Sequence, residues 1–349
     1  MIEPDSTLAA YGWNNRFAAL FSPFDGRGRT PGRIVRHDRG AFLVATPGGI
    51  AHLPSRRSTG TLTVGDWVVV EDGAIGDVLE RASLLRRRDP DAGEQLLAAN
   101  VDVVAMVLGA DRPVKAGRLY RTRTQIWDAG ANPLVVLTKT DLLDGVDSVV
   151  DRIHEIDALL DVMAVCSFNG DGLAALREHV AGRTLVLIGE SGAGKSTLVN
   201  ALVGGEVAAV SPVRATDHRG RHTTTARELH LLPGGGVLID TPGLREVGLW
   251  TDESAVDSIF PEIEDLADEC HFRDCTHGPE PGCAVVEAVA GGRLTEERYA
   301  AWVSLRREAE SAARRADEHA RRAYERKFGR VAKEAVKAKT RSARSLDRR

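Results

Sequence analysis

The sequence predicts a multidomain protein: a small N-terminal β-barrel, a central α/β domain with a parallel sheet, and a C-terminal α-helical domain with a metal-binding segment. Short β-rich runs broken by Gly and Pro turns fill residues 31–85. From residue 100, apolar strands alternate with helical segments, as in a parallel sheet covered by helices. After residue 250 the strand pattern stops, and three Cys cluster beside His residues. The expected divisions are a flexible N-terminus at 1–30, the barrel at 31–90, the α/β domain at 91–250, the metal-binding helical domain at 251–340 and a disordered tail at 341–349.

The barrel segment holds about five expected strands and no helical pattern. Its size and turn spacing favour an OB-fold, a barrel type that often binds oligonucleotides, and an SH3-like barrel of this size also fits. The stretch LLRRRDPD at 84–91 follows the barrel and reads as an exposed basic linker.

The composition is that of a globular protein without a membrane span. Of the 349 residues, 43% are hydrophobic and 28% are charged. No run of about 18 uninterrupted apolar residues is present, so no membrane-spanning helix is expected. The N-terminus starts acidic and lacks a basic-then-apolar leader. We therefore expect a cytoplasmic protein, and we expect it to be a monomer.

Positive charge is concentrated at the C-terminal end. Residues 301–349 carry 16 Lys and Arg against 7 Asp and Glu, a net charge of +9 within a chain of net charge −4. The first 300 residues therefore carry −13. A basic tail on an acidic body indicates a polyanionic partner, with nucleic acid the leading candidate and a solvated helix surface the alternative.

A phosphate-binding loop is the most specific motif. The stretch GESGAGKS fits the pattern G-x-x-x-x-G-K-[ST] in full, after an apolar strand and before a helix. Backbone N–H groups of such a loop point at phosphate oxygens, and the helix N-terminus adds positive potential. Lys195 is expected to reach the β- and γ-phosphates, and Ser196 to ligate Mg²⁺. The alternative is a glycine-rich turn without a ligand. The residues expected around the phosphates are Gly189, Glu190, Ser191, Gly192, Ala193, Gly194, Lys195, Ser196 and Thr197.

Two further segments are expected to sense the γ-phosphate and the magnesium ion. Asp240 ends the strand GGVLID and is placed to hold Mg²⁺ through water, while the N–H of Gly243 can sense the γ-phosphate. The Thr-rich stretch RGRHTTTARELHLL lies before it. A Thr in such a stretch coordinates Mg²⁺ only when the γ-phosphate is present, which makes the segment an order–disorder switch. Thr224 is the first candidate for this ligand, and Thr225 is the next.

The stretch VVLTKTDLL predicts a guanine-reading loop at the end of a strand. The carboxylate of Asp141 can accept hydrogen bonds from guanine N1–H and N2–H₂, a donor pair that adenine lacks. The Lys139 stem would lie along the base, and Thr138 stands where Asn is commoner. Ser167, at the end of the next strand, would contact the guanine oxygen from a second base loop.

The order of these loops is rearranged. The chain reads base loop, second base loop, phosphate loop, switch and Asp-Thr-Pro-Gly, which is the ordinary GTPase order cut and rejoined. Sites at the C-terminal ends of parallel strands stay together whatever the chain order. The sequence therefore predicts a circularly permuted P-loop GTPase that uses GTP, GDP and Mg²⁺. A P-loop ATPase or nucleotide kinase is the more distant reading, disfavoured by TKTD and by Asp-Thr-Pro-Gly.

The stretch CHFRDCTHGPEPGC predicts a structural zinc site. Cys270, Cys275, His277 and Cys283 follow one another at spacings x4, x1 and x5. Three thiolates and one imidazole form a closed tetrahedral set without an open position for catalysis. His271 is a competing ligand, and buried core Cys with a surface His is the alternative without metal.

These motifs together resemble the ribosome small-subunit-dependent GTPase A (RsgA) family over roughly residues 30–300, through GAGKSTL, GRHTTT, DTPG, TKTD and the Cys/His stretch. The resemblance implies an N-terminal OB domain, a permuted GTPase, a zinc domain and a role in late maturation of the small (30S) ribosomal subunit. In that family the zinc ligands match the four residues named above.

Water activation for hydrolysis needs a residue other than the usual Gln, because Leu244 follows Gly243. His222, directly before the Thr run, is the local candidate, and the resemblance implies the same role. A surface His that caps the switch loop is the alternative. Without a supplied helper, turnover should be slow.

Basic residues could meet 16S rRNA in three places, and none has interleaved aromatic residues, which favours recognition of shape and phosphate. They are Arg56 and Arg57, the run RRR at 86–88, and the C-terminal Arg321, Arg322, Arg326, Lys327, Arg330 and Lys333. The leading hypothesis is a GTPase switch whose hydrolysis is stimulated by the 30S subunit. The alternative is a GTP-binding assembly protein with incidental hydrolysis.

Overall fold

The fold is taken from a computed structural model, and two compact units make up the chain, Met1–Thr251 and Asp252–Arg349. Among the described residues, no helix is both long and apolar enough to cross a membrane. The structure describes residues 6–26, 28–38, 40–89, 93–207, 227–240, 256–257, 259–272, 274–278, 280–311 and 314.

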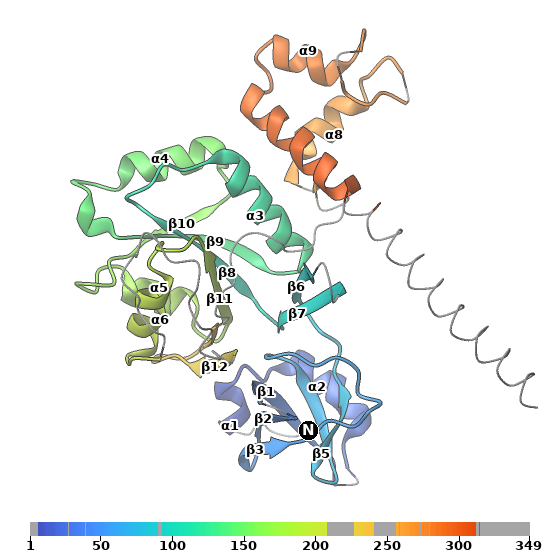
Figure 1. Cartoon of the computed structure of the whole chain (residues 1–349), viewed down its shortest axis with the longest axis vertical. Helices are drawn as coiled ribbons and strands as arrows, with labels where there is room; N and C mark the ends of the chain where they lie inside the picture. The colour runs from blue at the N-terminus through green and yellow to red at the C-terminus, as the bar shows by residue number, and fades with distance from the viewer. Residues whose placement is uncertain are drawn as a thin grey trace, which may run out of the picture. The chain divides into compact units, whose positions relative to one another are not determined.

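The N-terminal part of the first unit is built from short helices and antiparallel strands (Figure 1). Strand β1 pairs with β2 and β4, β2 with β3, and β4 with β5. An isolated parallel bridge links Ser55, just after β3, with Ile75 of β5 at the other end of this set. Its elements are α1 (Ser6–Ala10), α2 (Asn15–Phe21), η1 (Ser22–Phe24), β1 (Thr30–Asp38), β2 (Ala41–Thr46), β3 (Gly49–Leu53), β4 (Trp67–Glu71) and β5 (Ala74–Val78).

The N-terminal segment differs from the prediction of a flexible region at 1–30. Its described residues form two helices, and the Asn14 side chain caps the second by accepting from the N–H groups of Arg16 and Phe17. This helical segment buries aromatic rings against the N-terminal strands: the ring centroid of Trp67 lies 4.9 Å from that of Trp13 and 5.2 Å from that of Phe17. Aromatic burial of this kind is enough to order short helices that have little intrinsic stability.

The basic stretch at 84–91 is also not an exposed linker. Its described residues belong to a two-stranded hairpin of β6 (Leu84–Asp89) and β7 (Gly93–Ala99), and Leu85 and Leu97 are buried. Arg87 donates to the side chain of Gln95 across the hairpin. The described part of this stretch is therefore a strand with a buried apolar side chain at Leu85.

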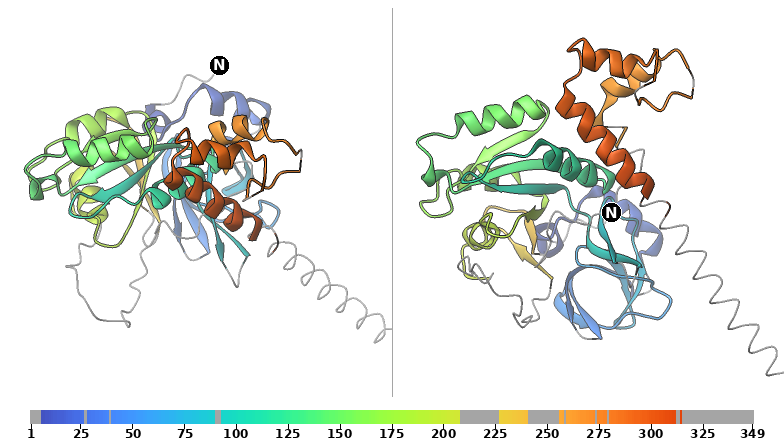
Figure 2. Two further views of the ribbon diagram at one scale, coloured as in Figure 1. Left: turned by 90° about the horizontal axis from the view of Figure 1, so that it is seen from above. Right: turned by 45° about the horizontal axis from the view of Figure 1, so that its top comes forward.

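The second part of the first unit is a parallel sheet with helices on both faces, as predicted (Figures 1 and 2). Its strand order is β10-β9-β8-β11-β13-β12, parallel except for the last strand. Helices α3 and α4 lie on one face, and α5 and α6 on the other. The elements are β8 (Val103–Gly109), α3 (Ala116–Asp128), β9 (Asn132–Thr138), η2 (Thr140–Leu142), α4 (Asp147–Ile156), β10 (Asp161–Ala164), α5 (Leu173–His179), β11 (Thr184–Gly189), α6 (Lys195–Val203), β12 (Glu228–Leu231) and β13 (Val237–Asp240).

Alternation along the strands builds the core between the sheet and α5 and α6, because every second strand side chain faces the same layer. This core consists of Val103, Ala105, Val107, Leu134, Val136, Val165, Leu173, Leu176, Val180, Leu185, Leu187, Ala193, Leu198, Val199, Leu202, Leu232 and Leu238.

The two parts of the first unit are joined through the sheet and through a buried arginine. Strand β1 pairs with β12 at Arg36 and Glu228. The guanidinium of Arg33 donates to Thr184 Oγ1 at 2.9 Å and to the carbonyl oxygen of Asn100 at 3.3 Å, and it lies over the ring of Trp67. Burial lowers the pKa of Arg33 to about 10, against the opposing effect of nearby carboxylates, and the group stays charged at neutral pH.

The second unit is helical in its described residues. Helices α8 (Pro261–Ala267) and α9 (Ala284–Ala290) are followed by a helical stretch at 296–311. Arg298 clamps the unit by pairing with Glu262 and donating to the carbonyl oxygen of Ile259. The Cys/His segment lies between α8 and α9.

Candidate functional site

The phosphate loop has the predicted strand–loop–helix structure. It leaves β11 at Gly189 and enters α6 at Lys195. Gly189 is required by close packing, because a Cβ there would lie 2.4 Å from the carbonyl oxygen of Val107. The ammonium of Lys195 donates to the carbonyl oxygens of Gly189 and Glu190, each at 2.7 Å. Two carbonyl oxygens of the loop are thereby bound to the ammonium of Lys195.

The base loop is tied to the phosphate loop by Thr138, at the end of β9. Its hydroxyl donates to the carbonyl oxygen of Ala193 at 2.6 Å and lies 3.3 Å from that of Leu108. Thr138 is only 2% exposed, so these bonds form in a dry environment. A threonine thus supplies the support that Asn commonly gives at this position.

Lys139 has a left-handed backbone with φ of 59°, an unfavourable conformation for a residue with a Cβ. Its ammonium pairs with Asp111 at 2.9 Å. The hydrogen bond from Lys139 holds the pKa of the Asp111 carboxyl below its usual value. Asp111 follows β8 in the loop DRP, and the sequence prediction did not include it because no motif marks that loop.

The two base loops meet at Asp141. The thiol of Cys166 lies 3.3 Å from Asp141 Oδ1 and is buried, so it can donate to the carboxylate that is expected to read guanine. The next residue, Ser167, has a buried hydroxyl with no hydrogen-bond partner among the described residues. Sequence reasoning treated Cys166 as an isolated cysteine and missed this contact.

Asp240 ends β13 at the same edge of the sheet, and its backbone lies opposite Glu228 of the antiparallel strand β12. Burial raises the pKa of Asp240; His230 opposes this effect and Glu228 adds to it. A cation beside the carboxylate would offset that burial cost. The other predicted switch residues, His222, Thr224, Thr225 and Gly243, lie outside the described residues.

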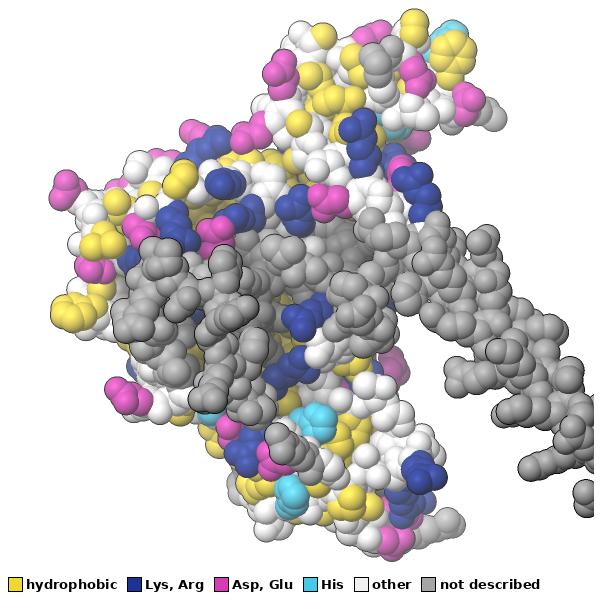
Figure 3. Space-filling model, in the orientation of Figure 1, with side chains coloured by type: hydrophobic (Ala, Val, Ile, Leu, Met, Phe, Trp, Pro, Cys, Tyr) yellow, Lys and Arg dark blue, Asp and Glu magenta, His cyan; other side chains and the backbone are white. Residues whose placement is uncertain are grey.

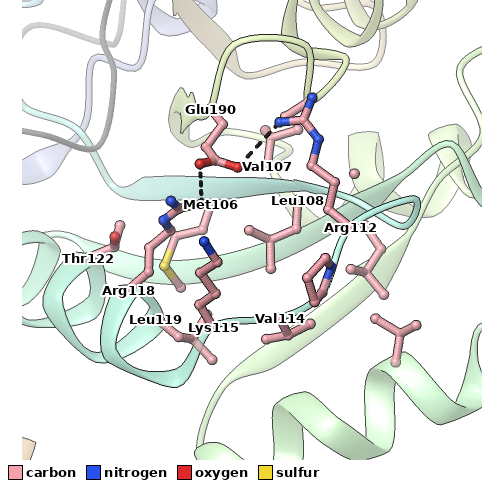
Figure 4. A pocket seen from close by; sticks show the side chains of 15 residues that line it. Met106, Val107, Leu108, Arg112, Val114, Lys115, Arg118, Leu119, Thr122 and Glu190 are labelled. Atoms are coloured by element: carbon pink, nitrogen blue, oxygen red, sulfur yellow. Dashed lines mark hydrogen bonds and ion pairs between the residues drawn. The ribbon is translucent and has the colours of Figure 1, made fainter. Parts of the chain in front are cut away.

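Glu190, the second residue of the phosphate loop, is held by two arginines from the segment after β8. Arg112 Nη1 lies 3.3 Å and Arg118 Nη1 2.5 Å from its carboxylate oxygens (Figure 4). Neither arginine was predicted as a site residue, because the contact joins residues 78 positions apart in the case of Arg112.

The predicted metal-ligand cluster forms in the second unit. The four ligand atoms of Cys270, Cys275, His277 and Cys283 all lie within 4.8 Å of one another. His277 Nδ1 lies 3.5 Å from the Cys270 sulfur and 3.9 Å from the Cys283 sulfur. His271, the competing ligand, is outside this group, and its ring packs edge-on against Phe272.

The chemistry of the cluster fits a cation such as zinc. The backbone N–H of His277 lowers the pKa of Cys275, but burial and the thiols of Cys283 and Cys270 outweigh it and raise that pKa to about 11. Burial and Arg306 lower the pKa of His277, which favours the neutral imidazole that binds metal. Tyr299 fixes the histidine by donating to its carbonyl oxygen at 2.6 Å. A cation that replaces the thiol protons would stabilise the three neighbouring thiolates, which otherwise repel one another.

Comparison with known proteins gives consistent matches. The sequence model of the RsgA GTPase family matches residues 78–250. The "Small ribosomal subunit biogenesis GTPase RsgA" of Streptomyces coelicolor is 40% identical over 96% of both chains. The crystal structure of YjeQ from Thermotoga maritima superposes with a TM-score of 0.62 at 27% identity, covering 80% of this chain and 98% of that one. The crystal structure of YloQ, described as a circularly permuted GTPase, gives a TM-score of 0.58 at 25% identity, covering 82% and 97%.

The geometry agrees with these matches. The base loops, the phosphate loop and Asp240 end β9, β10, β11 and β13, which brings them to one edge of the parallel sheet in the permuted order. With a relative this similar over nearly its whole length, the chain belongs to the RsgA GTPase family and is a circularly permuted P-loop enzyme that hydrolyses GTP.

Proposed function

We propose that this GTPase acts as a switch in late maturation of the small ribosomal subunit, in the cytoplasm and as a monomer, and that docking on the subunit stimulates its GTP hydrolysis. The observation that carries the proposal is that the sequence contains all the GTPase loop motifs and that its relatives are named for small-subunit biogenesis. A switch of this kind must hold GTP until the correct partner is reached, which suits an enzyme without the usual water-orienting Gln.

In this proposal each loop has one task. Lys195 binds the β- and γ-phosphates, and the remaining residues of the loop, from Gly189 to Thr197, surround the phosphate oxygens. Ser196 and Thr224 ligate Mg²⁺, and Asp240 holds it through water. Gly243 senses the γ-phosphate, and His222 orients the attacking water.

Guanine recognition falls to the two base loops. Asp141 accepts from the base, the Lys139 stem covers one face, and Ser167 contacts the guanine oxygen. The Thr138 and Cys166 contacts support this assignment, because they hold the base loops in one place relative to the phosphate loop.

The N-terminal strands are proposed to form an OB-type barrel that contacts 16S rRNA. The strand order β3-β2-β1-β4-β5 and the parallel bridge that joins its ends support the barrel. The Lys and Arg side chains on the face drawn in Figure 3 support contact with a polyanion. Arg56 pairs with Glu71 and Asp72, so it is less available to phosphate than the sequence suggests.

The Cys/His cluster is proposed to hold one structural Zn²⁺ in a separate domain after residue 250. The closed set of three sulfurs and one nitrogen leaves no position for a substrate. Its task would be to fold a loop-rich segment that has too small a core of its own.

The test is phosphate release from GTP and from ATP, with and without purified small ribosomal subunits. We expect turnover of GTP alone, with at least about a tenfold increase on addition of subunits, since supplied helpers raise GTPase rates by larger factors. Lys195→Ala serves as the nucleotide-site control, and large subunits as the partner control. GTP binding without stimulation would favour the passive assembly protein, and equal use of ATP would refute the assignment of the base loops.

A matched variant pair examines water activation. His222→Ala should lower stimulated turnover while GDP affinity stays close to that of the parent, because the residue is assigned to the water and not to the diphosphate. His179→Ala, at the end of α5, is the control. Parallel loss of turnover and GDP affinity in H222A would contradict the role.

A further inference from the structure

The outer side of the phosphate loop is braced by a three-residue ion cluster. The Glu190 carboxylate receives Arg118 from α3 and Arg112 from the preceding loop, and both contacts are drawn in Figure 4. Burial alone would raise the pKa of Glu190, but the two arginines outweigh it and hold that pKa below its usual value. The cluster therefore stays ionised at neutral pH.

Arg112 makes a second contact that does not involve Glu190. Its Nη1 donates to the carbonyl oxygen of Ser191 at 3.1 Å. In a trans peptide the C=O and the following N–H point in opposite directions. A carbonyl of Ser191 held by Arg112 on the outside therefore aims the N–H of Gly192 away from the arginine, toward the loop interior.

The two preceding carbonyl oxygens also accept hydrogen bonds from a cationic side chain. Lys195 takes those of Gly189 and Glu190, and Arg112 takes that of Ser191. Three successive carbonyl oxygens are thus bound to cations. This arrangement selects the backbone conformation in which the N–H groups can converge on an anion.

The arginines serve the loop rather than a separate ligand. The cavity between β8, α3 and Glu190 has a volume of about 30 Å³, enough for one or two water molecules. Its wall is mostly apolar, with Met106, Leu108, Val114 and Leu119 among the lining residues. The Glu190 carboxylate already pairs with both guanidinium groups, which leaves the cluster a net charge of only +1.

We propose that Arg112 and Arg118 are positioning residues for nucleotide binding: Arg118 acts through Glu190, and Arg112 acts both through Glu190 and directly on the Ser191 peptide. The brace holds the phosphate loop in its anion-binding conformation before the nucleotide arrives. This inference rests on the assignment of residues 189–196 as the phosphate site.

A double-mutant analysis of GDP dissociation tests the brace, with a fluorescent GDP analogue as the probe. We expect Arg118→Gln and Glu190→Gln each to speed dissociation about threefold, and Arg112→Gln about tenfold, since these are partly exposed charge-assisted contacts. The combination R118Q/E190Q should equal E190Q alone, because the proposed effect of Arg118 on the loop runs through Glu190. The combination R112Q/E190Q should release GDP about threefold faster than E190Q alone, because it also removes the bond to Ser191.

Two further variants separate positioning from general stability. Arg118→Lys keeps the charge and should release GDP at close to the parent rate. If Arg118 acted only through packing, lysine would not restore that rate. Arg152→Gln removes a surface arginine that pairs with Glu155 at 3.2 Å on α4, and it should leave dissociation unchanged. Melting temperatures of all variants without nucleotide should agree within about 3 °C, as expected for surface changes.

The opposite result has a clear physical meaning. If the arginines act as a positive field on the phosphates, E190Q would tighten GDP binding, and the losses in R112Q and R118Q would add regardless of Glu190. Either observation overturns the brace. Lys195→Ala is measured in parallel. If K195A leaves GDP affinity intact, the phosphate-site assignment itself is wrong. If K195A loses GDP affinity but the R112Q, R118Q and E190Q variants release GDP at the parent rate, only the brace is rejected.

Discussion

The hydroxyl of Thr138 donates a 2.6 Å hydrogen bond to the carbonyl oxygen of Ala193, and this bond joins the TKTD loop after β9 to the glycine-rich loop after β11. Gly194 packs against the same side chain: a Cβ added at Gly194 would lie 3.2 Å from Thr138 Oγ1. The permuted chain order separates the two loops by 55 residues, yet the contact makes them a single binding surface.

Thr138→Val should weaken GDP binding. Valine keeps the shape but leaves the buried Ala193 carbonyl without its donor, a loss of about 1–2 kcal/mol or roughly 5- to 30-fold in affinity. Titration calorimetry measures the effect. Thr46→Val removes a comparable hydroxyl-to-carbonyl bond, to Gly49 in the β2–β3 turn, and should not alter affinity. Equal losses in the two variants would show a general stability effect instead.

Asp141→Asn should exchange guanine for xanthine nucleotides. The amide presents a donor where the carboxylate presents only acceptors, which inverts the pattern that guanine requires. Competition between GTP and XTP for the purified protein measures the preference. Asp144→Asn, an exposed neighbour in the same loop, is the matched control. An unchanged GTP preference in D141N would remove TKTD from the base site.

Cys166 is expected to hold Asp141 in the orientation that guanine needs. Cys166→Ala removes the donor and should raise the Kd for GDP about three- to tenfold, whereas Cys166→Ser keeps a donor and should bind close to the parent value. Fluorescence titration with a GDP analogue gives both values. The idea fails if serine and alanine weaken binding equally.

Metal removal should unfold the second unit and spare the first. The cluster supplies four ligands to a segment whose described residues between 268 and 282 are not buried, so a strong chelator should abolish the cooperative melting of the second unit while GDP binding persists. Elemental analysis should find one zinc per chain. His277→Ala should lose the metal, and His271→Ala should retain it. Zinc retained in H277A and lost in H271A would reverse the ligand assignment.

The local motifs were sufficient to predict the strands and loops on which the candidate nucleotide residues lie. A strand–loop–helix turn with G-x-x-x-x-G-K-S carries its own backbone requirements, and TKTD follows a buried strand that is readable from its apolar run. The Cys/His spacing likewise selected the four residues that come together.

The supporting contacts could not be predicted in this way. Arg112 and Glu190 are 78 residues apart, and Asp141 meets Cys166 only because β9 and β10 are neighbours in the sheet. The N-terminal helices were missed for a related reason. Each is too short for a helical period to register, and the partner that orders them, Trp67, lies far along the sequence.

Arg33 joins the N-terminal strands to the parallel sheet. It is 1% exposed, and its guanidinium reaches Thr184 of β11, Asn100 after the hairpin and the carbonyl oxygen of Tyr11. A chain that begins at β8 would lack Arg33 and the Trp67 ring beneath it. It would also lack β1, which would leave the edge of β12 open to pairing with other molecules. The nucleotide-binding half of this protein should therefore not survive as an isolated fragment, and its heat denaturation should be one transition shared with the N-terminal strands.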